Sequence, residues 1–284
     1  MRSSLVPVIG VALVAATACA PSQPDAANTS AAREAPGAQT GEATTVDSGS
    51  VAQAVEVDHV YVVTRPGAPE VALLRAAGFA VSEQRSNHTG NGSSSVSVIF
   101  ENVYLELLYA DSAVSDSANS PAERAHWERV FNWRTSAASP IGVGLRRLAS
   151  GPDSLPFPTE RLPTMAWMQP GTNMHLVTTP ADSLAPGVFV VPRYMALTGW
   201  IDEARRDTAF AAFLHHPVGV RRVTGVRVVV AHPEGIPPTV RRLREAGVLQ
   251  IEQGAEPLVE LTFDGGTRGG SEDFRPELPL VIRY

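Results

Sequence analysis

The sequence predicts an α+β fold of two similar modules that are separated by a long insert. In each module a β-branched, apolar run typical of a strand is followed by a short amphipathic helix and by further strand-like runs. The two helices end alike, with the sequences Arg75-Ala76-Ala77-Gly78 and Arg244-Glu245-Ala246-Gly247. Because a unit that recurs along a chain indicates the fold more strongly than a single motif does, we place module one at residues 55–110 and module two at residues 217–284.

Each module is expected to run strand, helix, strand, strand, strand. In module one the first strand covers residues 55–63 and the helix covers residues 69–78, where Gly78 provides a left-handed cap. Its remaining strands are expected at residues 79–83, 95–100 and 104–109. Module two is expected to form a strand, a helix and three further strands at residues 225–231, 237–247, 248–252, 258–263 and 278–284.

The insert, residues 111–216, is too long to be an unstructured loop in a compact domain. It holds all four tryptophans of the chain and strand-like runs at residues 141–145 and 188–192. We expect it to cover the modules and to shape an apolar pocket. The alternative is that its aromatic side chains only pack the insert onto the modules.

Composition excludes several classes of function. With 284 residues the chain is long enough to bury a large core. Its net charge of -6 and the lack of a basic stripe argue against a nucleic-acid partner. All 23 basic residues are arginine, which excludes chemistry that needs a lysine, such as a Schiff base or a phosphate-loop lysine. Cys19 is the only cysteine, so disulfides and a cysteine nucleophile are excluded from the folded body.

The N-terminus predicts export. Arg2 precedes a short apolar run, and small residues lead to Cys19, a pattern that resembles the lipobox of bacterial lipoproteins. We expect a signal peptide at residues 1–19 and a lipid anchor on Cys19, which would be the protein's one link to a membrane of the bacterial cell envelope. An ordinary secretory signal cleaved close to this cysteine is the alternative. Residues 20–54 are rich in small and polar side chains and are expected to form a disordered tether.

Module one carries a histidine and a carboxylate inside apolar strand-like runs. His59 lies in Asp58-His59-Val60-Tyr61-Val62-Val63, and Glu106 lies in Tyr104-Leu105-Glu106-Leu107-Leu108. A buried charge is unfavourable unless something pairs with it, and a divalent metal or a substrate held between these side chains would supply that pairing. The alternative is a polar pair that hydrogen-bonds within the sheet.

A glycine-rich turn, His88-x-Gly90-x-Gly92, lies between these two strands in the sequence. Gly90 and Gly92 permit the positive φ angles that let backbone N–H groups converge on an anion or a carbonyl. We therefore expect both glycines to bind substrate. A plain glycine-rich hairpin is the alternative.

Together these motifs resemble the glyoxalase-like branch of the vicinal oxygen chelate (glyoxalase/bleomycin resistance/dioxygenase) superfamily. The resemblance covers residues 56–110 well and residues 217–284 in outline. It implies paired βαβββ modules whose curled, mixed sheet forms an open cup, often with a divalent metal on the cup floor. Family metal ligands lie on the first and fourth strands of each module, positions that match His59 and Glu106 in module one.

His88 belongs to the turn motif and is our third expected metal ligand, ahead of His175 and His216. Two histidines and a carboxylate suit a non-haem iron or manganese ion, and zinc with a bound water is equally permitted. Module two is expected to add no ligand, because it places Val226 where module one has His59, and an aliphatic side chain where module one has Glu106.

Two functions follow from this resemblance. The first is a metal-dependent enzyme, a lyase, isomerase or dioxygenase, that acts on a small oxygen-rich substrate and uses Glu106 as a metal ligand or as a catalytic base. The second is a non-catalytic envelope lipoprotein that binds a small molecule in the same cup. A purely structural envelope module is a third reading and predicts no cavity.

Overall fold

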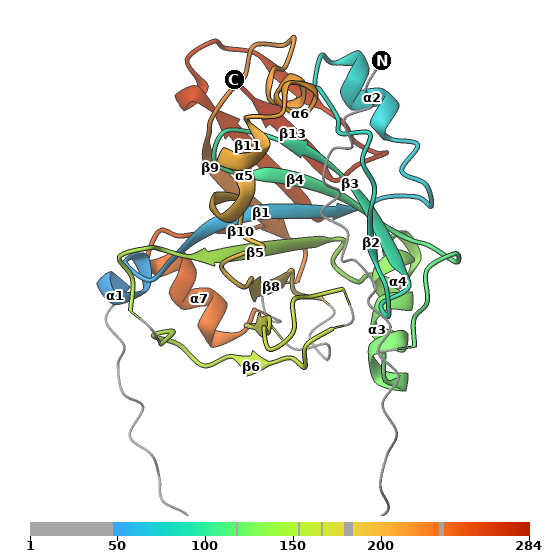
Figure 1. Cartoon of the computed structure of the whole chain (residues 1–284), viewed down its shortest axis with the longest axis vertical. Coiled ribbons are helices and arrows are strands. Elements are labelled where there is room, and N and C mark those ends of the chain that lie inside the picture. Colours follow the sequence, from blue (N-terminus) through green and yellow to red (C-terminus); the bar gives the residue numbers. More distant parts are fainter. Residues whose placement is uncertain (1–47, 118, 153, 166, 179–183, 233–235) are drawn as a thin grey trace, which may run out of the picture.

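The computed structural model describes residues 48–117, 119–152, 154–165, 167–178, 184–232 and 236–284. The expected signal peptide, its Cys19 and the greater part of the expected tether lie outside these ranges. The protein is an α+β protein with two mixed sheets, one of eight strands and one of five (Figure 1).

The larger sheet is built by residues 55–190. Its strands are β1 Val55–Val63, β2 Ser86–His88, β3 Ser93–Ile99, β4 Tyr104–Ala110, β5 Ile141–Arg147, β6 Glu160–Arg161, β7 His175–Leu176 and β8 Gly187–Val190. They lie in the order β2-β3-β4-β1-β5-β8-β7-β6, with β1 parallel to β4 and antiparallel to β5. The order is therefore symmetric about β1 and β5, because each of these two strands is followed outward by the fourth, third and second strand of its own group.

The smaller sheet is built by residues 223–283. Its strands are β9 Val223–Val230, β10 Gln250–Gln253, β11 Leu258–Phe263, β12 Ser271–Asp273 and β13 Leu280–Arg283. They lie in the order β10-β9-β11-β13-β12, and successive pairs are parallel, antiparallel, parallel and antiparallel. Strands β4-β1-β5-β8-β7 of the larger sheet follow the same sequence of pairings.

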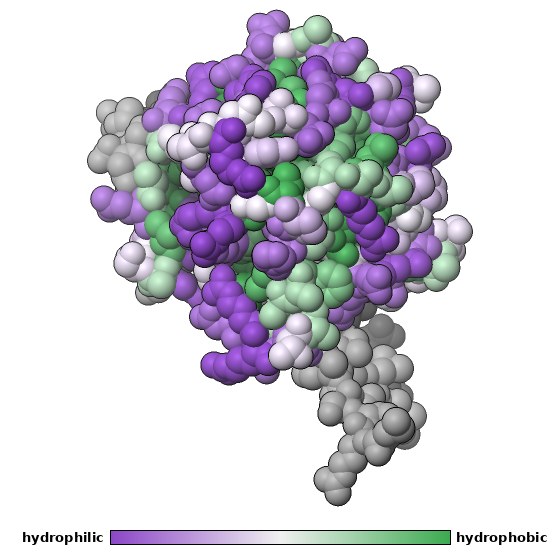
Figure 2. Space-filling view, turned by 90° about the horizontal axis from the view of Figure 1, so that it is seen from above, coloured by the Kyte–Doolittle hydropathy of each residue, from purple (hydrophilic) through white to green (hydrophobic). Residues whose placement is uncertain are grey.

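The main apolar core lies between the two sheets. Alternate residues of both sheets enter it, such as Val60 and Val62 of β1 and Val259 and Leu261 of β11, all of which are fully buried. In Figure 1 the strands of the smaller sheet lie behind those of the larger one. From above, apolar side chains reach the surface only in scattered areas between polar ones (Figure 2).

Short helices lie around the two sheets. They are α1 Ser48–Ala52, α2 Val71–Ala76, α3 Pro121–Phe131, α4 Trp133–Ser136, α5 Leu197–Ala204, α6 Thr208–Ala211, α7 Pro238–Glu245 and the 3-10 helices η1 Ala212–Leu214 and η3 Asp264–Gly266. Gly78, just after α2, has the positive φ of 84° that the sequence predicted for the cap. Within the described part of the chain, no helix has the length and apolar character needed to cross a membrane.

The folded domain begins earlier than the sequence predicted. Residues 48–52 form α1, and Val51 is fully buried against the core, so the last part of the expected tether belongs to the domain. Val51 and Ala54 both pack into the core, although the composition of this segment suggested disorder.

The expected pairing of residues 55–110 with residues 217–284 in one sheet is corrected by the strand order. The strands that continue the larger sheet beyond β1 are β5 to β8, which come from the expected insert, and residues 217–284 form the separate smaller sheet. The strand-like runs at residues 141–145 and 188–192 were expected, but their place beside β1 was not, because the pairing of distant strands leaves no local pattern in the sequence. Within the described residues no helix separates β5 from β6, so this part of the chain lacks the helix that the expected module has. Residues 217–284 do contain such a helix, and the sequence therefore predicted the second module there.

The shape of the larger sheet also differs from the expected cup. The sheet is open, with β2 and β6 at its two edges, and neither sheet is closed or strongly curled. Residues 79–83, expected as a strand, form none, although Phe79 and Val81 are buried in the core. The short strand follows at residues 86–88 instead.

Candidate functional site

The structure brings His59, Glu106 and His88 together on the outer face of the larger sheet. They come from β1, β4 and β2. The Nε2 atom of His59 lies 4.0 Å from Oε2 of Glu106, and the Nε2 atom of His88 lies 3.6 Å from Oε1. The Glu106 side chain is only 13% exposed, so a carboxylate lies nearly buried between two imidazoles.

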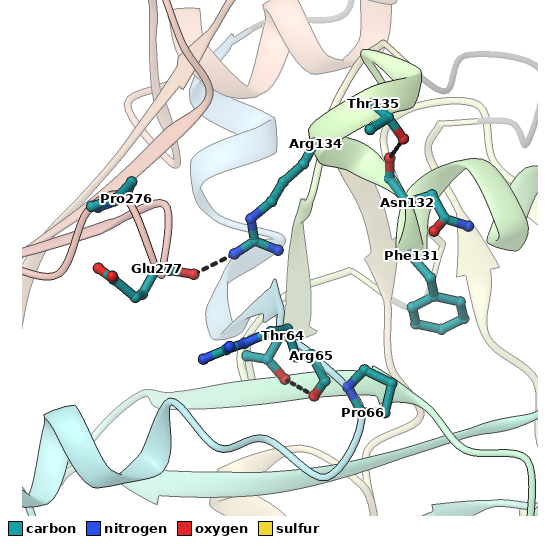
Figure 3. Close-up of a pocket in the computed structure, with 9 residues that line it drawn as sticks. All are labelled: Thr64, Arg65, Pro66, Phe131, Asn132, Arg134, Thr135, Pro276 and Glu277. Carbon is teal, nitrogen blue, oxygen red and sulfur yellow. Dashed lines mark hydrogen bonds between the residues drawn. The ribbon is translucent and has the colours of Figure 1, made fainter.

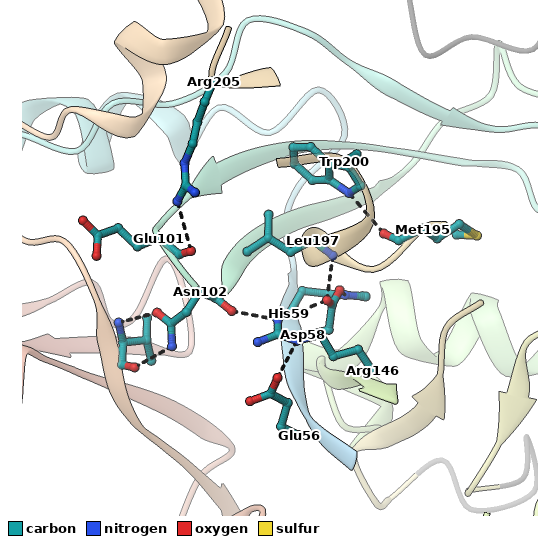
Figure 4. Close-up of polar contacts among 11 residues, drawn as sticks. Glu56, Asp58, His59, Glu101, Asn102, Arg146, Met195, Leu197, Trp200 and Arg205 are labelled. Carbon is teal, nitrogen blue, oxygen red and sulfur yellow. Dashed lines mark hydrogen bonds and ion pairs between the residues drawn. The ribbon is translucent and has the colours of Figure 1, made fainter. Parts of the chain in front are cut away.

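A β-bulge explains why Asp58 and His59, although consecutive, can contact each other. The register of β1 against β5 shifts between Val57 and His59, and such a bulge re-aims side chains that would otherwise alternate between faces. The Nδ1 atom of His59 lies 2.9 Å from Oδ2 of Asp58 (Figure 4). An ionised carboxylate can only accept, so Nδ1 carries the proton and Nε2 faces Glu106.

Asp58 is held in place by further donors. It is fully buried and accepts hydrogen bonds from the backbone N–H of Leu197 at 2.8 Å and from Nη1 of Arg146 at 3.3 Å. Arg146, itself buried, also donates to Glu56 and to the backbone carbonyl of Asn102 (Figure 4). This network, Glu56–Arg146–Asp58, fixes the orientation of the His59 ring, as outer carboxylates do for histidines in functional sites.

Glycines on β5 leave room for the rings on β1. A Cβ atom at Gly144 would lie 2.1 Å from Cε1 of His59, and one at Gly142 would lie 2.0 Å from Cε1 of Tyr61. On its other side His59 stacks on Tyr104, with ring centroids 4.5 Å apart and planes inclined by 18°. These glycines are therefore required by the site, and they are also the reason why β5 offers no polar side chain at this place.

Burial shifts the pKa of three neighbouring groups in the direction that favours their neutral form. It lowers the pKa of His88, against an opposite effect of the nearby Glu106 charge. It also raises the pKa of Tyr61 and Tyr104, and the charge of Glu106 adds to both increases. His88 is held by a 3.1 Å contact between Nδ1 and Oγ of Ser93.

Glu106 lacks the partners that a buried carboxylate usually has. In the described ranges neither of its oxygens receives a hydrogen bond, and the two imidazole contacts of 3.6 and 4.0 Å exceed hydrogen-bond length. Each histidine approaches a different oxygen of Glu106. The two Nε2 atoms therefore lie on either side of the carboxylate, and the three side chains do not surround one point where a metal ion could be bound. Across the described residues, no group of three or more His, Cys, Asp or Glu side chains is arranged to hold a metal ion. The expected metal set does not fit, and we derive no step through a metal.

The glycine-rich turn does not offer free donors. Gly90 and Gly92 do have the expected positive φ, 101° and 68°. However, their N–H groups both donate to the backbone carbonyl of Ser115, at 2.6 and 3.0 Å. The proposed substrate-binding role of these two glycines is therefore corrected: they join the turn to the segment after β4.

The other candidate histidines have structural partners. His216 is buried; its Nδ1 accepts from the N–H of Ala80 at 3.0 Å, and its Nε2 lies 3.1 Å from the carbonyl of Ile99. His175, on β7, contacts the Thr159 hydroxyl at 3.1 Å. Neither contacts Glu106, so neither completes the site.

The aromatic side chains of the expected insert pack as two clusters beside the site. One joins Tyr61 and Leu108 to Trp127 and Trp133, and the other joins Tyr104 to Trp200. This favours the packing alternative over a broad apolar pocket. Sequence reasoning also missed Arg146, whose signal was an arginine at the end of the apolar strand β5.

Comparisons with known proteins add little. No family model matches the chain, and no curated protein matches it. Among solved structures, a hypothetical protein from Staphylococcus aureus matches with a TM-score of 0.48 and 9% sequence identity, over 81% of this chain and 99% of that chain.

Proposed function

We propose that the protein binds a small molecule at the cluster of His59, Glu106 and His88, and that Glu106 is the group the ligand contacts. The observation that carries this proposal is the nearly buried Glu106 carboxylate without a hydrogen-bond donor. A carboxylate with little contact with solvent and no donor from the protein is stabilised by a ligand that donates to it. An ionisable side chain that lies in an energetically unfavourable environment, and that its neighbours hold in one orientation, is typical of a functional site.

The chemistry of the site defines the ligand. Because Asp58 bonds to the Nδ1 side of His59, the Nε2 atom of the ring faces the acceptor oxygens of Glu106. A carboxylate only accepts, so the ligand complementary to Glu106 carries O–H or N–H donors or a positive charge. The rings of Tyr104 and Phe189 flank His59 and suit the apolar part of such a molecule.

A relationship to the vicinal oxygen chelate superfamily is part of this proposal. The symmetric order of the larger sheet, with β1–β4 on one side and β5–β8 on the other, supports paired modules within residues 55–190. In this pairing the second module supplies Gly144 and Phe189 next to His59, which are not ligands. We also propose, from the sequence alone, that the protein is exported and anchored to the cell envelope through Cys19.

Nuclear magnetic resonance of the histidine rings tests the proposal. Ethanolamine and acetate are suitable probes, because the first offers donors and a positive charge and the second offers only acceptors. Ethanolamine should shift the ring nitrogen signals of His59 and His88 in a saturable way, and acetate should not. The response should disappear in Glu106→Gln. An unresponsive wild type, or an equal response in the variant, would contradict the proposal.

Metal analysis separates this proposal from the metal-dependent enzyme. Wild type, His59→Ala and Glu106→Ala should all purify with negligible iron, manganese and zinc. One equivalent of metal in wild type that is lost in both variants would establish the enzyme reading instead.

A further inference from the structure

A second candidate site lies in a crevice at the end of β1, and its lining residues are separate from the His59–Glu106–His88 cluster. The crevice has a volume of about 500 Å³ and lies between the loop after β1, the α3–α4 corner and the turn before β13 (Figure 3). Its polar lining includes Thr64, Arg65, Asn132, Arg134 and Thr135. Three segments that are distant in sequence therefore meet around this space. The side-chain donors of Thr64, Asn132 and Thr135 bond to backbone carbonyls, so the two arginines are the groups that a ligand would contact.

Arg134 projects its guanidinium group into this space. Its Nη2 atom donates to the backbone carbonyl of Glu277 at 2.5 Å, and the group lies over the ring of Trp133 at 4.3 Å. These contacts hold the group in one position. Among the described residues no carboxylate forms an ion pair with Arg134. Glu277 also lines the crevice, but its side chain points away from Arg134 in Figure 3.

Arg65 faces the same space from the opposite wall. Its Nε atom donates to the buried Glu70 carboxylate at 2.8 Å, which orients the guanidinium and leaves its two terminal nitrogens for another partner. The side chain is 60% exposed, so an ion from solvent can reach it. Two oriented guanidinium groups thus share one crevice.

We propose that this crevice is an oxyanion site that binds a phosphate group between Arg65 and Arg134. A guanidinium donates two parallel hydrogen bonds to a pair of oxygens, and phosphate offers enough oxygens to serve both arginines at once. A carboxylate, with two oxygens, satisfies one arginine fully. This site uses no residue of the His59–Glu106–His88 cluster and does not depend on the function proposed there.

Titration of the mature protein with inorganic phosphate tests the site. The side-chain N–H signals of Arg65 and Arg134 should shift and saturate, while chloride at equal ionic strength has no such effect. Arg134→Gln should weaken the binding about tenfold or more, since it removes a charge-assisted pair. Arg244→Gln is the matched control, because it removes the same charge from an exposed position on α7.

Each outcome decides the proposal. Phosphate binding that is lost in Arg134→Gln and kept in Arg244→Gln supports it, provided both variants unfold at the midpoint of wild type. If Arg134→Gln unfolds earlier, Arg65→Gln serves as the second variant, with the same expected loss. An equal response to chloride, or an affinity for acetate equal to that for phosphate, would overturn the assignment.

Discussion

The two sheets of this protein have corresponding strands but treat their charged side chains differently. In the smaller sheet Arg227 of β9 bonds to Glu260 of β11 at 3.0 Å and to Glu252 of β10 at 2.9 Å. Arg283 completes this cluster with a 2.7 Å contact to Glu260. Although burial alone would raise the pKa of Glu260, its hydrogen bonds to these arginines lower it.

In the larger sheet the corresponding strands hold a carboxylate without such partners. Glu106 of β4 lies beside Tyr61 of β1, as Gln250 of β10 lies beside Arg227 of β9. In this sheet the guanidinium group of Arg146 forms an ion pair with Asp58 and not with Glu106. The charges of the smaller sheet are paired with one another, whereas Glu106 has no such partner, and we propose that it is available to a ligand.

The largest expected effect comes from removing Arg146. Arg146→Met should lower the free energy of unfolding by about 3–5 kcal/mol, because the fully buried Asp58 loses its charged partner. The corresponding change in the smaller sheet, Arg227→Met, should cost only about 1 kcal/mol, since that cluster is partly exposed. Urea unfolding of both variants measures the difference. Equal losses would remove the distinction between the two sheets.

A smaller effect is expected at Gly144. The added methyl group of Gly144→Ala would overlap the His59 ring, so we expect a loss of about 1–3 kcal/mol and displaced ring signals for His59. In Gly225→Ala, on β9, the nearest atom is 3.4 Å away, so stability should change by less than about 0.5 kcal/mol. Unchanged His59 signals in the first variant would show that the imidazole does not lie over β5.

The smallest expected effect is a pH dependence of the unfolding free energy that comes from the buried His216. Burial lowers the pKa of His216 below its ordinary value of 6.5, so the unfolded chain binds more protons than the folded one just below that pH. Stability should therefore be complete above about pH 6.5 and decrease as the pH falls through the lowered pKa. His88 and His175 act in the same direction.

Unfolding measured between pH 7.5 and 5.5 checks this expectation. His216→Asn should flatten the pH dependence relative to wild type, whatever its effect on absolute stability. A slope identical to that of wild type would mean that His216 does not titrate on unfolding.

The sequence predicted local features of the site well and its larger context poorly. His59 and Glu106 could be named because polar side chains inside apolar strands need a partner, and His88 could be named because it belongs to the glycine-rich turn motif. The hydrogen bonds of Gly90 and Gly92 to Ser115 could not be predicted from the sequence, because they join a turn to a segment more than twenty residues away. For the same reason the pairing of β1 with β5 was missed: register between distant strands is set by the folded core and leaves no local pattern.

The unfolding free energy of Glu106→Gln tests the central claim most directly. If Glu106 is held without partners for the sake of a ligand, replacing its charge with a neutral amide of the same shape should leave stability unchanged or raise it by about 1 kcal/mol. A loss of more than about 1 kcal/mol in the unliganded protein would show that Glu106 is a structural partner of the two histidines, and would contradict the account.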